Sequence, residues 1–78
     1  MKYIIIDDRK DGQMFAEEYD NKEEAIQAAD KEWQYYLTAD EKKRMAAYFV
    51  LESENPSEDA DNHFDGNPVK VYKDYDHD

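Results

Sequence analysis

The amino-acid sequence predicts an α+β fold in which an antiparallel sheet of about four strands carries one long amphipathic helix on one face. Three observations predict it: an Asp-Gly pair between two strand-like runs, a central run with helical apolar spacing, and two further strand-like runs near the end of the 78-residue chain. The expected element order is β-β-α-α-β-β. We expect a single domain over residues 1–73 and a frayed acidic tail over residues 74–78.

Residues 2–8 (KYIIIDD) and 13–19 are expected to pair as a hairpin. Asp11-Gly12 between them is typical of a two-residue type I′ turn, because that turn needs positive φ at both central positions. The resulting register pairs Ile4 with Tyr19, Ile6 with Glu17 and Asp8 with Phe15, and it turns one set of side chains toward the helix: Ile4, Ile6, Phe15 and Tyr19. The candidate open sheet face then carries Tyr3, Ile5 and Met14, together with Ala16.

Residues 21–37 (NKEEAIQAADKEWQYYL) are expected to form the long helix. Its apolar stripe follows the spacing i, i+3, i+7, i+10 and i+11 and consists of Ile26, Ala29, Trp33, Tyr36 and Leu37. Asn21 is the expected N-cap, with Glu24 at the third helical position. A second, short helix is expected after Thr38, which forms a capping box with Glu41.

Residues 46–53 (AAYFVLES) are expected to form the third strand, with Tyr48 and Val50 on one side and Phe49 and Leu51 on the other. Residues 54–67 are polar and predict a long loop, and residues 69–72 predict a short fourth strand. Because only one substantial helix is available, one apolar face of the sheet would stay partly open. That face is either ordinary surface or, if contiguous, a site for a partner or a second copy.

The net charge of −11, from 21 acidic and 10 basic residues, limits the classes of partner. Phosphate contacts need a basic surface, so direct binding to nucleic acid is not expected, and an anionic membrane is disfavoured for the same reason. No run approaches the length of a signal-peptide core or of a membrane span. Cysteine is absent, which fits a reducing compartment. We therefore expect a cytoplasmic protein.

A distinctive electrostatic feature lies between residues 45 and 69, where the chain has no Lys or Arg. The segment forms a candidate acidic interaction surface that consists of Glu52, Glu54, Glu58, Asp59, Asp61 and Asp65. A solvated loop is the simpler interpretation. The sharper one is a docking surface for a basic protein, because a row of carboxylates can imitate a row of phosphates.

Two segments have part of the spacing of an EF-hand calcium loop. The first has suitable residues at loop positions 1, 5, 6 and 12, but a cation at position 3; these residues are Asp7, Asp11, Gly12, Glu18 and Arg9. The second has suitable residues only in part, with His63 at position 3 and Tyr72 at position 12; it offers Asp61, Asp65 and Gly66. A hairpin turn and a solvated loop are the favoured interpretations, so no metal site and no cofactor is predicted.

Enzymatic activity is not expected. The two histidines, His63 and His77, have no ligand partners spaced for zinc. No serine, cysteine or lysine nucleophile stands in a recognisable motif with His63. Pairs of carboxylates do not indicate a catalytic site in this chain, because acidic residues are so frequent that such pairs are expected by chance.

The runs KYIIIDD, FAEEYDNKEEAIQAADKEW, YFVLES, HFDG and VKVY together cover most of the chain. In these runs the chain resembles a group of small acidic uncharacterised (hypothetical) proteins of gut Firmicutes and their mobile elements. The resemblance implies a bacterial cytoplasmic setting and gives no site residues to carry over.

Together these features predict a small, acidic, non-enzymatic protein-binding module, monomeric or weakly homodimeric, whose partner is a protein, with a basic protein as one option. Two alternatives stay open. One is a nucleic-acid-mimicking inhibitor of a basic DNA-binding or restriction-type protein, which the net charge of −11 motivates. The other is a weak calcium-binding protein.

Overall fold

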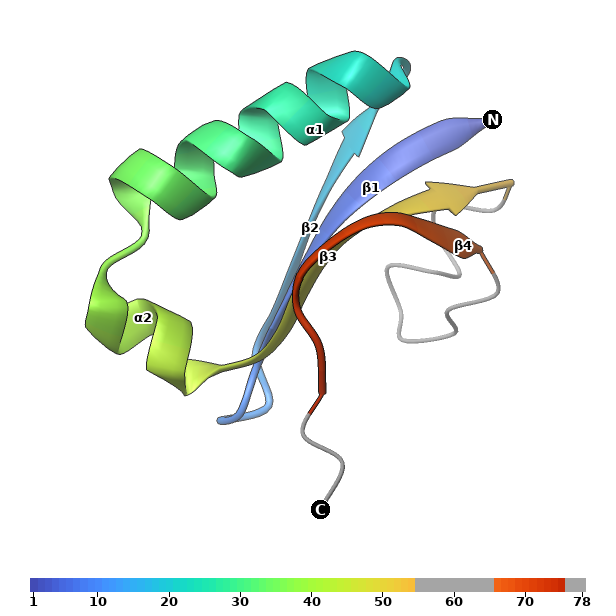
Figure 1. Ribbon diagram of the computed structural model, residues 1–78. Helices are drawn as coiled ribbons and strands as arrows, with labels where there is room; N and C mark the ends of the chain where they lie inside the picture. Colours follow the sequence, from blue (N-terminus) through green and yellow to red (C-terminus); the bar gives the residue numbers. More distant parts are fainter. Residues whose placement is uncertain (55–65, 76–78) are drawn as a thin grey trace.

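The computed structural model describes residues 1–54 and 66–75 and confirms an α+β fold on a four-stranded antiparallel sheet (Figure 1). In chain order the elements are β1 (Lys2–Arg9), β2 (Met14–Tyr19), α1 (Lys22–Lys31), the π-helical turn η1 (Glu32–Tyr36), α2 (Ala39–Arg44), β3 (Met45–Ser53) and β4 (Asn67–Lys73). The strand order β2-β1-β3-β4 makes β1 and β3 central and β2 and β4 the two edges. Both helices lie on one side of the sheet (Figure 1). In the described part of the chain, no helix is long and apolar enough to cross a membrane.

The central strand β3 is buried on both faces, and its side chains alternate as the sequence predicts. Tyr48 and Val50 point toward the helices, and Phe49 and Leu51 point away from them. The helix-side cluster is completed by Ile5, Ala25, Ala29, Leu37 and Met45. The cluster on the far face is completed by Ile4, Ile6 and Ala47, and the partly buried Met14 and Tyr75 pack against it.

The predicted hairpin register is wrong by one residue. Ile4 pairs with Glu18 and Ile6 pairs with Ala16. The connection has three residues rather than two: the Arg9 N–H donates to the Gln13 carbonyl at 2.8 Å, and the Gly12 N–H donates to the Arg9 carbonyl at 3.2 Å. Gly12 has φ of 93°, the left-handed conformation that closes a three-residue hairpin loop. The extra residue sends every side chain of one strand to the other face.

This shift overturns the predicted open sheet face. Ile5 is only 4 % exposed and belongs to the helix-side cluster, and Tyr3 packs against the same cluster. Met14 does lie on the far face, but the fully buried Ile4 and Ile6 lie there with it. The Tyr75 hydroxyl also lies there and donates a hydrogen bond to Asp8 Oδ2 at 2.6 Å. Residues 76–78 of the expected tail lie outside the described residues.

Both predicted helix caps are confirmed. The Asn21 side chain accepts hydrogen bonds from the backbone N–H groups of Glu23 and Glu24 at 2.8 and 3.3 Å. Thr38 and Glu41 form the reciprocal capping box, with bonds of 3.1 and 3.2 Å. These caps fix the start of α1 and of α2 at the positions that the sequence indicates.

The prediction of a single long helix is only partly correct. α1 ends at Lys31, and the chain continues directly into a wider π-helical turn. The Leu37 N–H closes this turn on the Glu32 carbonyl at 2.8 Å. A π turn adds one residue, which changes the face that later residues present. Leu37 is therefore buried, whereas Tyr36 is 64 % exposed.

Three aromatic rings join the helical segment to the sheet. Trp33 of η1 stacks on Tyr48 of β3 with ring centroids 5.5 Å apart, and Tyr72 of β4 lies 5.7 Å from Trp33 and 5.5 Å from Tyr48. Lys42 of α2 places its Nζ 4.7 Å from the centre of the Trp33 ring. One ring cluster therefore connects η1, α2, β3 and β4.

Replacing Trp33 with alanine removes the centre of this ring cluster. We expect Trp33→Ala to lower the free energy of unfolding by about 3 kcal/mol in urea denaturation. The control Tyr35→Ala removes an aromatic ring that is 76 % exposed in the same turn, and it is expected to change stability by less than about 0.5 kcal/mol. Equal effects of the two substitutions would show that the Trp33 ring does not support the core.

Candidate functional site

A pocket of about 190 Å³ opens between η1 and the edge strand β2. Side chains and backbone of four elements line it: Ile5 and Asp7 from β1, Phe15, Ala16 and Glu17 from β2, Glu32 from η1 and Tyr48 from β3. Small-molecule sites usually measure about 300–1,000 Å³. The pocket is therefore closer in size to one amino-acid side chain than to a metabolite or a drug.

The Tyr48 hydroxyl is the unusual group of this pocket. Tyr48 is fully buried, and its hydroxyl makes no hydrogen bond of normal geometry with the described residues, although Glu32 lies close enough to interact with it. Burial, followed by the nearby negative charge of Glu32, raises the pKa of the Tyr48 phenol. A buried polar group without a partner costs about 1–3 kcal/mol. This hydroxyl is therefore open to a hydrogen bond from a bound group.

Two carboxylates face the same space and form no ion pair within the described residues. They are Glu32, which is partly buried, and Glu17, which is exposed. Burial raises the pKa of Glu32, and the negative charges of Glu17 and Asp7 act in the same direction, while the Tyr48 hydroxyl and Arg9 oppose them. The pocket thus holds negative charge that no cation among the described residues pairs with.

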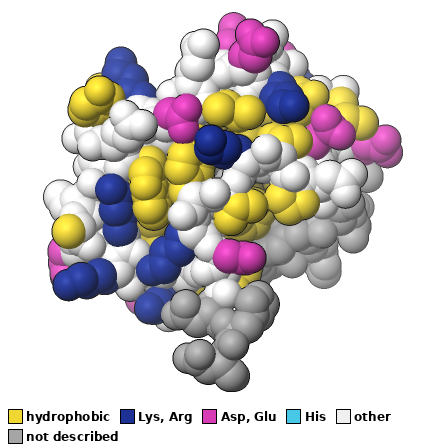
Figure 2. All heavy atoms as spheres, in the orientation of Figure 1, with side chains coloured by type: hydrophobic (Ala, Val, Ile, Leu, Met, Phe, Trp, Pro, Cys, Tyr) yellow, Lys and Arg dark blue, Asp and Glu magenta, His cyan; other side chains and the backbone are white. Residues whose placement is uncertain are grey.

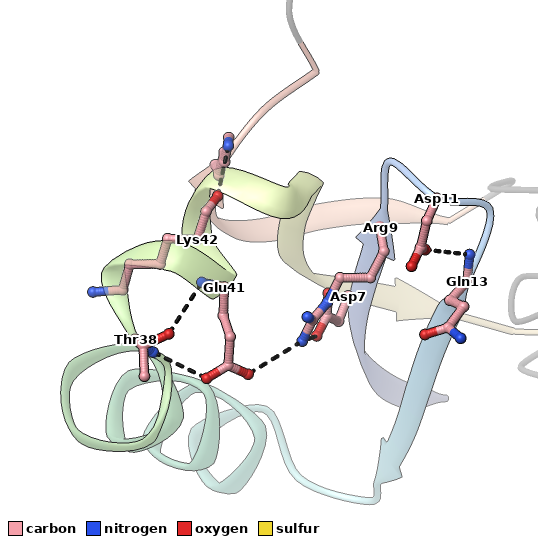
Figure 3. Close-up of polar contacts among 8 residues, drawn as sticks. Asp7, Arg9, Asp11, Gln13, Thr38, Glu41 and Lys42 are labelled. Atoms are coloured by element: carbon pink, nitrogen blue, oxygen red, sulfur yellow. Dashed lines mark hydrogen bonds and ion pairs between the residues drawn. The ribbon is translucent and has the colours of Figure 1, made fainter.

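The third carboxylate of the pocket, Asp7, is already neutralised. The Arg9 guanidinium donates to both Asp7 oxygens, from Nε at 2.8 Å and from Nη2 at 2.9 Å. The same Nη2 lies 3.8 Å from Oε2 of Glu41, which belongs to the capping box with Thr38 (Figure 3). This chain of contacts ties β1 to the start of α2 and leaves Glu17 and Glu32 as the unpaired charges.

The rim and walls of the pocket are apolar. Phe15 is 53 % exposed at the rim, and the Arg9 guanidinium carbon lies 5.6 Å from its ring centre. Ile5 forms part of the wall. Such a site suits a group with an apolar stem and a positively charged end. Within residues 1–54 and 66–75, no three His, Asp or Glu side chains come together as a possible metal site.

The predicted acidic interaction surface is described only in part. Glu52 is partly buried and accepts a hydrogen bond from the Tyr3 hydroxyl at 3.1 Å, whereas Glu54 is exposed. The remaining members lie outside the described residues: Glu58, Asp59, Asp61 and Asp65. The described part therefore places neither Glu52 nor Glu54 in the pocket.

The first calcium-loop candidate folds as the β1–β2 hairpin. Asp7 is bound by Arg9. Asp7 pairs with Phe15 and Ile4 pairs with Glu18, so Asp7 and Glu18 lie on opposite faces of the sheet. Asp11 instead accepts a hydrogen bond from the Gln13 N–H at 3.0 Å (Figure 3). Asp61, His63 and Asp65 of the second candidate lie outside the described residues.

The sequence analysis missed Glu32 and the Tyr48 hydroxyl as site residues. Glu32 carried a usable signal, because Ala25, Ala29 and Glu32 follow the spacing i, i+4 and i+7 of one helical face. The predicted apolar stripe ran through Ile26, and Glu32 was not considered as part of the face toward the sheet. Nothing in the sequence marks the Tyr48 hydroxyl as lacking a hydrogen bond, because this depends on which side chains of η1 pack beside the Tyr48 ring.

A scan against protein-family models, a search of curated proteins and a search of solved structures each found no match to this chain. Function is therefore inferred from the residues of the pocket and of the neighbouring sheet edge.

The raised pKa of Glu32 has a testable consequence for stability. The folded protein binds the Glu32 proton more tightly than the unfolded chain does, so this residue lowers stability as pH rises above its ordinary pKa of 4.5. We expect Glu32→Gln to raise the melting temperature at neutral pH and to lose this advantage below that value. Glu18→Gln, which removes an exposed charge on β2, should give a smaller gain. A gain for Glu32→Gln that is equal at both pH values would contradict the assignment.

Proposed function

We propose that the protein is a small, acidic, non-enzymatic protein-binding module of a bacterial cytoplasm, and that it binds a basic partner segment along the free edge of β2. The observation that carries the proposal is the edge strand β2, whose outer side pairs with no other strand in the described part of the chain and which presents an exposed aromatic ring beside acidic side chains. The resemblance to small acidic proteins of gut Firmicutes and their mobile elements is the only support for the bacterial setting.

The two edges of the sheet differ in how well they are protected against pairing. β4 contains Pro68, Lys70 and Lys73, and its pairing with β3 shifts register twice. Proline, lysine and irregular pairing all hinder the addition of another strand. β2 has the sequence MFAEEY, without proline or lysine, and pairs with β1 in unbroken register. β2 is therefore the edge that can accept a partner strand.

The charge of β2 indicates which partner fits. Glu17 and Glu18 are exposed near the middle of the strand, and Asp20 follows it. A second copy paired at this edge would bring like charges together, which opposes a homodimer through β2. A basic segment would meet opposite charges, and Phe15 would supply apolar contact area beside them. Charge and shape together favour a basic protein partner.

The nucleic-acid mimic is the second candidate, supported by the net charge of −11. That charge is distributed unevenly in the described structure. Five of the ten basic residues lie on α2 and β4: Lys42, Lys43, Arg44, Lys70 and Lys73. Lys and Arg side chains lie among hydrophobic ones on the face that Figure 2 shows. A protein with such a basic side is better suited to binding through one acidic edge than to imitating a phosphate backbone all round.

A strand-forming peptide of alternating lysine and valine tests the proposal. In nuclear magnetic resonance titrations we expect shifts of the backbone amides of β2, with those of β4 as the internal reference. Binding should weaken as salt is added, because exposed charges are screened. The double variant Glu17→Lys, Glu18→Lys should abolish binding, and Phe15→Ala should weaken it about five-fold or more.

The matched control is Glu23→Lys, Glu24→Lys, which makes the same charge change on the exposed first turn of α1. If both double variants weaken binding equally, net charge alone governs association and the mimic becomes the better account. Shifts confined to β4, or no shifts at all, would refute the β2 edge.

A further inference from the structure

The pocket beside β2 has a feature that a strand edge does not require. An edge binds through backbone groups, yet Tyr48 and Glu32, which both carry side-chain oxygens, line the space behind it. The hydroxyl of Tyr48 is buried without a partner, and Glu32 forms no ion pair with the described residues. A buried group of this kind is ordinarily satisfied within the fold. Its lack of a partner points to a ligand.

We infer that this pocket receives the lysine side chain of a bound partner strand, with the ammonium hydrogen-bonded to the Tyr48 hydroxyl oxygen and paired with Glu32 and Glu17. The inference rests on the proposed binding at the β2 edge and names the anchor of that interaction. The ammonium has three donors and no acceptor, and the pocket offers three acceptor groups from three different elements.

Lysine suits the geometry better than other side chains. Neighbouring strands lie about 4.8 Å apart, so a residue of the added strand must reach across β2 to enter the pocket. A long, flexible stem can do this and can pack its methylene groups against Ile5 and Phe15. Acceptors that converge from different elements fit a compact ammonium, whereas arginine presents a flat fork that matches a single carboxylate.

Arg9, the basic side chain beside the pocket, does not occupy the position proposed for the lysine ammonium. Arg9 is the basic residue that acts on Glu32 in the described structure. Its guanidinium is occupied by both oxygens of Asp7 and lies against Phe15 and Glu41. Arg9 therefore lines the approach and leaves Glu32 and Glu17 available.

Two pentapeptides with acetylated N-termini and amidated C-termini test the inference. One is Thr-Val-Lys-Val-Thr, and the control has norleucine in place of lysine. Norleucine keeps the stem and lacks the charge. We expect the lysine peptide to bind about ten-fold more tightly, because a hydrogen-bonded charge is lost with norleucine. Tyr48→Phe and Glu32→Gln should each reduce this preference about three-fold or more, while Glu23→Gln on α1 should keep it.

The outcomes separate this inference from the proposed edge. Equal affinity of the two peptides, with shifts at β2, would overturn the lysine pocket and leave the edge intact. Absence of shifts at β2 with either peptide would overturn the edge. The pocket is then decided by n-butylammonium alone: shifts of the Tyr48 ring and of the Glu32 side chain support it, and no shifts at these groups overturn it.

Discussion

The burial of the Tyr48 ring between Trp33 and Tyr72 is the contact on which the rest of the structure depends. It joins the π-helical turn to a central strand and to an edge strand, and Lys42 of α2 closes over Trp33 from outside. Burying so large a ring favours packing, but it also takes a hydroxyl out of water. No described neighbour forms a hydrogen bond of normal geometry with that hydroxyl. The packing that stabilises the fold therefore also leaves a buried hydroxyl oxygen beside the pocket without such a bond.

The parts of the fold that follow from local chemistry were predictable. The caps at Asn21 and Thr38 depend on side chains a few residues away, and the alternation of Tyr48, Phe49, Val50 and Leu51 depends only on strand geometry. The hairpin register was not predictable, because Asp11-Gly12 suits both a two-residue and a three-residue loop. With the three-residue loop, Ile5 lies beneath the helices, and Ile4 and Ile6 lie on the opposite face of the sheet. The set of residues expected on the open face was therefore wrong.

The candidate site was the hardest feature to read from the sequence. It is composed of residues that look structural one at a time: a strand tyrosine, a helical glutamate and a strand phenylalanine. Glu32 follows Ala25 and Ala29 on the helical face that is turned toward the sheet. The pairing of Asp7 with Arg9 leaves Glu17 and Glu32 without an ion pair among the described residues. Composition favoured a basic partner, and the unequal protection of β2 and β4 supports the β2 edge as its proposed binding site.

The unpartnered hydroxyl of Tyr48 is the central claim, and the free energy of unfolding of Tyr48→Phe tests it most directly. Phenylalanine keeps the ring and removes only the oxygen. If the hydroxyl has no partner, the variant should be more stable than the original protein by about 1–3 kcal/mol in urea denaturation, because the cost of burying the oxygen is removed. A loss of more than about 1 kcal/mol would mean that the hydroxyl already makes a hydrogen bond in the folded chain, and the pocket would then have no vacancy for a ligand to fill.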